Sequence, residues 1–134
     1  MPYRALCGLL GAAWLVAGGG LLAMFVAYHA PGGRSEGLFS TMGPQGHYMA
    51  AFAGCAIVVW GCALIAAAWR PLEARGIGAA SALGLVLCAA YRLMAFVVGD
   101  YAELGNLLRV EAGVFLVLAL GFVWLRPRAP GAAS

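Results

Sequence analysis

Charged residues are scarce in this sequence. Only 10% of its 134 residues are charged and 64% are hydrophobic, whereas soluble domains carry about 25% charged residues. Lysine is absent, and the eight arginines are scattered along the chain instead of clustering as a phosphate-binding face requires. These shortages exclude a soluble enzyme, a disordered tail and a nucleic-acid-binding module, and they indicate a chain whose solvent is lipid.

Several motifs are also missing. The four cysteines, Cys7, Cys55, Cys62 and Cys88, form no Cys-x-x-Cys pair, which disfavours a quinone-linked thiol oxidoreductase. They fall within apolar stretches, and we interpret them as small buried hydrophobic residues. The first apolar stretch contains no acidic residue, which a small proton-coupled multidrug exporter would need there. No stretch carries the polar stripe of a channel.

Four apolar stretches are each long enough to cross a bilayer, which needs about 20 residues. They are Ala5–Tyr28, His47–Trp69, Ile77–Gly99 and Leu107–Leu125. They lack the alternation of barrel strands, and backbone groups in lipid must be hydrogen-bonded within the segment. We therefore predict an all-α fold: one transmembrane domain over residues 1–134, an antiparallel four-helix bundle with a disordered tail at about 127–134.

Arginine placement predicts the orientation of the bundle. One side would carry Arg4, Arg70, Arg75, Arg126 and Arg128 against the single acid Glu73. The opposite side would carry Arg34 against Glu36, Asp100 and Glu103. The positive-inside rule then places both termini in the cytoplasm. No small-x-small cleavage pattern follows the first stretch, so we expect it to be a retained anchor rather than a signal peptide.

Two ionisable residues lie inside the predicted spans. Arg92 sits about 10 Å deep in the third stretch and Glu111 about 6 Å deep in the fourth, measured from the same side. An unpaired charge there is costly, so we predict an Arg92–Glu111 pair facing the bundle interior. Arg109 would snorkel outward or compete for Glu111. The pair either fixes the register of two helices or forms the floor of an external-facing pocket. The candidate lining residues of that pocket are Tyr91, Asp100, His47 and Tyr48.

The two histidines are weaker candidates. His29 closes the first stretch and His47 opens the second, and two imidazoles on adjacent helices are one way to ligate a haem iron. Solvated interfacial histidines are far commoner, and the histidines and Glu36 show no diagnostic metal-ligand spacing. We therefore predict no metal site and no cofactor, with haem or a quinone as the alternative.

The third and fourth stretches resemble a known family. Tyr91-Arg92-Leu93-Met94, the Gly99-Asp100 turn and the early Glu111 resemble a bacterial family of four-helix membrane proteins of unknown function, distantly similar to the DoxX-like proteins. Its members carry an arginine in the third helix, an Asp-Gly-type turn and a glutamate early in the fourth. The resemblance implies a four-helix topology and, with the charge distribution, a multi-pass protein of the bacterial inner membrane.

These observations favour a non-enzymatic membrane protein, either an accessory subunit or a small-ligand-binding module. Its partners would be the lipid bilayer and, through glycine-rich helix faces, copies of itself or a larger membrane complex. The alternative is a redox or lipid-modifying enzyme that holds a quinone or a lipid head group near Arg92 and Glu111. A bound chromophore, or loss of activity in Arg92→Ala with the fold intact, would favour the alternative.

Overall fold

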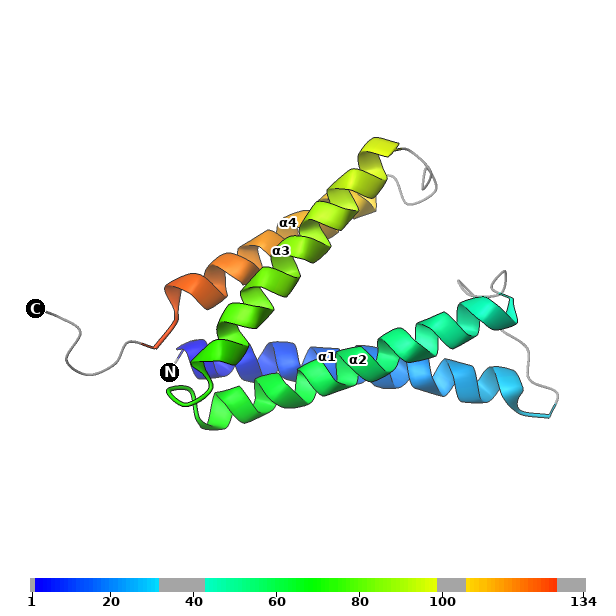
Figure 1. The fold of residues 1–134 in the computed structure, drawn as a ribbon, viewed down its shortest axis with the longest axis horizontal. Helices are drawn as coiled ribbons and strands as arrows, with labels where there is room; N and C mark the ends of the chain where they lie inside the picture. The colour runs from blue at the N-terminus through cyan, green and yellow to red at the C-terminus, as the bar shows by residue number, and fades with distance from the viewer. Residues whose placement is uncertain (1, 32–42, 99–105, 128–134) are drawn as a thin grey trace, which may run out of the picture. The chain divides into compact units, whose positions relative to one another are not determined.

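The described part of the chain is almost entirely helical. The computed structural model describes residues 2–31, 43–98 and 106–127, which form α1 (Pro2–His29), α2 (Pro44–Trp69), α3 (Arg75–Val98) and α4 (Asn106–Trp124) (Figure 1). Each helix is long and apolar enough to cross a membrane, and no strand occurs in these described ranges. The all-α, four-helix prediction is confirmed. The single antiparallel bundle and the cytoplasmic placement of both termini stay predictions, and most of the predicted tail lies outside the described residues.

The helices extend beyond the apolar stretches that predicted them. Both α1 and α2 begin three residues earlier than expected, each at a proline. Proline suits the first helical position because a backbone N–H at that position has no partner within the helix, so nothing is lost when proline lacks it. The fixed φ of proline also matches the helix. Hydropathy detects only the part of a helix that crosses lipid, so it misses these polar and proline-containing first turns.

The described helices divide between two compact units. Residues 8–66, with most of α1 and α2, form one unit, and residues 1–7 with 67–134, including α3 and α4, form the other. We call them the α1/α2 unit and the α3/α4 unit and describe each by itself. The prediction of one domain over the whole chain stays a prediction.

The α1/α2 unit is held together by two glycine pairs. A Cβ added at Gly18 would lie 2.7 Å from the carbonyl oxygen of Gly54, and one added at Gly54 would lie 2.9 Å from that of Gly18. Gly11 and Gly61 show the same reciprocal distance of 2.9 Å. The earlier glycine of α1 meets the later glycine of α2, and the later glycine of α1 meets the earlier one of α2. The two helices therefore run in opposite directions. Glycine is required here because any side chain would separate the backbones.

Aromatic side chains pack between the same two helices. The rings of Trp14 and Trp60 lie 5.5 Å apart, and both side chains are partly buried. Near the ends of the helices, Tyr28 stacks on His47 with ring centroids 4.0 Å apart. The ring contacts add to the glycine contacts that bring the two backbones together.

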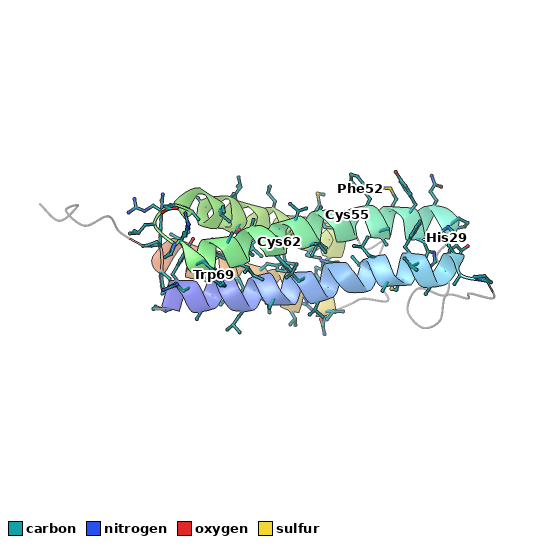
Figure 2. The ribbon with its side chains drawn as sticks, turned by 90° about the horizontal axis from the view of Figure 1, so that it is seen from below. His29, Phe52, Cys55, Cys62 and Trp69 are labelled. Atoms are coloured by element: carbon teal, nitrogen blue, oxygen red, sulfur yellow. The ribbon has the colours of Figure 1, made fainter. Side chains whose placement is uncertain are left out.

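The cysteines of α2 correct one interpretation. Cys55 and Cys62 are exposed, and Figure 2 shows both on α2 together with the exposed Phe52. Each cysteine directly follows a glycine of the α1 contact, and one residue turns an α-helix by about 100°. Their side chains therefore point away from α1, and the prediction of buried cysteines is wrong for these two. Cys7 is buried as predicted.

The α3/α4 unit packs mainly through small residues. Its buried side chains are Ser81, Ala82, Leu85, Ala89 and Ala95 on α3 and Leu108, Ala112, Ala119 and Phe122 on α4. Larger residues on both helices, such as Leu83 and Val117, are exposed. Soluble proteins bury their large apolar side chains, whereas here the small side chains are buried and large ones are exposed. This arrangement suits a chain in lipid, where an exposed leucine costs nothing and close helix contact depends on small side chains.

The first turn of α1 belongs to the α3/α4 unit. The Tyr3 ring meets Phe122 edge-on, with centroids 6.1 Å apart, and a Cβ added at Gly78 would collide with the Tyr3 hydroxyl. The guanidinium of Arg4 donates from Nε to the carbonyl oxygen of Ala68, 2.7 Å away, near the end of α2. Sequence reasoning missed this junction because the predicted span begins only at Ala5.

Candidate functional site

The central pair of the candidate site joins α3 to α4. Arg92 Nε lies 3.1 Å from Glu111 Oε2, so the structure brings together the two side chains that the sequence paired. Arg92 is six residues before the end of α3, about 9 Å along the helix axis. Glu111 is five residues after the start of α4, about 7.5 Å along its axis. Among the described residues, these two charges lie farthest from any helix end.

The pair is only partly covered. Each of the two side chains keeps 34% of its surface exposed, so the α3/α4 hairpin does not seal them. An ion pair in lipid compensates each charge with the other, but guanidinium and carboxylate groups still have further donors and acceptors to satisfy. The exposed third of each side chain offers these groups to whatever lies against the hairpin.

Arg109 does not compete for Glu111. Its guanidinium lies over the Phe96 ring, 4.6 Å from the centroid, and it donates a hydrogen bond to the Asn106 side chain. This cation–π contact and the hydrogen bond hold Arg109 toward the end of the hairpin, in agreement with the snorkelling alternative. Arg92 is left as the one described cation paired with Glu111.

The other predicted pocket residues are distributed across the chain. Tyr91 is exposed on α3, next to Arg92 in sequence. Asp100 lies outside the described residues. His47 and Tyr48 lie on α2, in the α1/α2 unit, where His47 is buried and Tyr48 is exposed. A pocket that combines these residues with the Arg92–Glu111 pair stays a prediction.

The histidines of the α1/α2 unit are held by the backbone. His47 Nδ1 lies 3.1 Å from the carbonyl oxygen of Gly43, and His29 Nδ1 lies 2.9 Å from that of Phe25. A carbonyl only accepts, so each Nδ1 carries a proton and donates the hydrogen bond. Tyr28 contacts both imidazoles, stacked on His47 and edge-on to His29, with centroids 4.0 Å and 5.1 Å apart.

Comparison of the chain with protein families, curated proteins and solved structures finds no match. The geometry alone therefore carries the functional argument. Within residues 2–31, 43–98 and 106–127, no group of three or more His, Cys, Asp or Glu side chains is placed to hold a metal ion. The described chemistry of the α3/α4 hairpin is that of a positive and a negative group side by side in an apolar surface.

Such a site can bind a ligand that carries polar groups. A guanidinium donates hydrogen bonds to an oxygen and a carboxylate accepts them from a hydroxyl or an amine, so the pair suits a ligand that presents both kinds of group. The Glu111 carboxylate is already engaged by the Arg92 guanidinium, 3.1 Å away.

Proposed function

We propose that this chain is a non-enzymatic module of the membrane that binds a small amphipathic ligand through Arg92 and Glu111. The supporting observation is an ion pair inside a membrane-spanning hairpin that leaves a third of each side chain uncovered. In lipid, the uncovered part of a guanidinium–carboxylate pair has donors and acceptors that neither partner satisfies. A partly open pair suits a ligand whose polar group completes its hydrogen bonds while an apolar body lies along the hairpin.

Other parts of the proposal rest on the sequence. The positive-inside distribution supports cytoplasmic termini, and the resemblance of the third and fourth helices to the bacterial four-helix family supports an inner-membrane location. The exposed apolar faces of all four helices are consistent with contact to the bilayer. An accessory role in a larger complex, or a homo-oligomer, belongs to the same proposal.

Native mass spectrometry of the protein purified in a mild detergent tests the proposal directly. We expect a small-molecule adduct on the wild-type chain, and we expect it to disappear in Arg92→Gln and Glu111→Gln. Arg109→Gln is the matched control, because it removes the same charge from the same hairpin outside the pair. The adduct should persist in this control, while gel filtration and circular dichroism verify that every variant is folded.

The same sample distinguishes the competing functions. An adduct that survives Arg92→Gln, or no adduct at any detergent concentration that preserves the fold, would contradict the proposed site. An absorption band of a haem, or the mass of a quinone, would favour the redox alternative. Co-purifying subunits or multiples of the chain mass would identify the complex in which the module works.

A further inference from the structure

Arginine gathers at the end of the α3/α4 unit that is farthest from the Arg92–Glu111 pair. The described members are Arg4, Arg70, Arg75 and Arg126, and we call this region the arginine end. The packing of Tyr3 against Gly78 and Phe122, and of Arg4 against Ala68, brings the relevant chain segments together. All four arginines belong to the same compact unit.

The positive charge of the arginine end is largely uncompensated. Among the residues that the structure describes, only Arg70 of this group has a carboxylate partner, Glu73 at 3.2 Å, and both of these side chains are more than two-thirds exposed. Arg4 instead donates to the carbonyl oxygens of Ala68 and Trp69, 2.7 Å and 3.5 Å away, which carry only partial charges. Four arginines and one glutamate leave a charge of +3 on the described residues of this end.

Arg75 is the most exceptional of the four. It has no hydrogen-bond or ion-pair partner among the described residues, and its Nε is shielded from solvent. A shielded guanidinium N–H without an acceptor costs the full desolvation of that group. Arginine also presents the donors of its two outer nitrogens in a planar fork that matches the oxygens of a phosphate, so an anion at these outer nitrogens would compensate the charge of Arg75.

An open groove lies beside Arg4. It has a volume of about 610 Å³ and is lined by Arg4, Ala5, Ala68 and Trp69, so its walls are apolar apart from the guanidinium. The Trp69 side chain is largely exposed, as is that of Trp124, in the manner of the aromatic residues that mark a membrane boundary. A charged group next to an apolar groove at that boundary matches a lipid, in which a phosphate adjoins an acyl chain.

We propose that the arginine end binds one anionic phospholipid. Its phosphate accepts hydrogen bonds from Arg4 and Arg75, and the upper part of one acyl chain lies in the groove between Ala5 and Ala68. The site is independent of the proposed function, because Arg75 and Arg92 are seventeen residues apart on α3, about 25 Å along the axis. An experiment that refutes one of the two sites therefore does not refute the other.

Lipid titration followed by native mass spectrometry provides the test. Delipidated protein in detergent is titrated with dioleoylphosphatidylglycerol or with dioleoylphosphatidylcholine, and bound lipids are counted from the mass of the complex. We expect the phosphatidylglycerol to bind at lower concentration. Arg75→Gln should weaken its binding about fivefold, the contribution of one arginine near an anionic lipid. Arg70→Gln removes the same charge from an exposed, already paired residue and should change binding less than about twofold.

Two further variants keep the test decisive. Ala5→Phe fills the groove without changing charge and should also weaken phosphatidylglycerol binding. Arg75→Lys keeps the charge but loses the planar fork, so it should bind phosphatidylglycerol more weakly than wild type. This variant replaces Arg75→Gln in the test if Arg75→Gln fails to fold. Circular dichroism and gel filtration establish the folding of each variant.

Several results would overturn the lipid site. Equal losses in Arg70→Gln and Arg75→Gln would mean that only diffuse charge attracts the lipid. Equal binding of the two lipids would mean that no headgroup is recognised. Displacement of bound phosphatidylglycerol by inorganic phosphate, with Ala5→Phe binding normally, would identify a site for a free anion instead.

Discussion

The Arg92–Glu111 pair should carry a measurable coupling energy. We consider Arg92→Gln, Glu111→Gln and the double variant, which together form a mutant cycle on one contact of 3.1 Å. Breaking a fully buried pair costs about 3–5 kcal/mol, whereas an exposed pair contributes about 0.2–1 kcal/mol. With 34% of each side chain exposed, this pair lies between those limits. We expect each single variant to lower the free energy of unfolding by about 1–3 kcal/mol.

The double variant should lose less than the sum of the two single losses. Once both charges are gone, neither is left unpaired in the apolar hairpin, so we expect a coupling of about 1–2 kcal/mol. The reversed pair, Arg92→Glu with Glu111→Arg, should recover part of the stability for the same reason.

Equilibrium unfolding in mixed micelles with increasing dodecyl sulfate, followed by circular dichroism, measures these free energies. Arg109→Gln, combined with Glu111→Gln in a second cycle, controls for general charge effects and should show additivity. If the losses of Arg92→Gln and Glu111→Gln simply add, to within about 0.5 kcal/mol, the two groups do not interact and the reasoning fails.

Three other predictions concern packing. Gly18→Ala should destabilise the α1/α2 unit by about 1–3 kcal/mol, because its Cβ would lie 2.7 Å from the carbonyl oxygen of Gly54. Gly19→Ala, whose Cβ would meet open space, should be neutral or stabilising. The unfolding assay described above measures both effects. Gly78→Ala should expel the Tyr3 ring and lower thermal stability, and Gly76→Ala, with nothing nearby, should not; equal effects would contradict the junction. Cys55→Leu and Cys62→Leu should change the free energy of unfolding by less than about 0.5 kcal/mol, whereas Cys7→Leu overpacks a buried position and should lower it by about 1–3 kcal/mol; equal effects would contradict the burial of Cys7.

The helices were predictable because lipid imposes a simple length rule. Any apolar stretch of about 20 residues must close its own backbone hydrogen bonds, so composition alone located four helices. The Arg92–Glu111 contact was predictable for a similar reason, since a charge within an apolar span needs a partner and Glu111 was the acid at matching depth. Whether that pair is a binding site does not follow from either argument.

The packing faces were not predictable, because the helices are apolar all round. In a soluble protein the polar face identifies the buried one, but here Gly18 and Gly19 look alike in sequence, and only Gly18 meets α2. The exposure of Cys55 follows from the contact at its neighbour Gly54, which no periodicity revealed. Tyr3 was missed because it precedes the apolar run that defined the first span.

The meeting of Tyr3 with Phe122 has a consequence for how the chain is made. Helices leave the ribosome in order, so the glycine pairs of α1 and α2 can close as soon as α2 is synthesised. Tyr3 must wait for the end of α4 before its ring is covered. A nascent chain interrupted before α4 therefore leaves Tyr3 without the Phe122 ring that covers it in the complete fold.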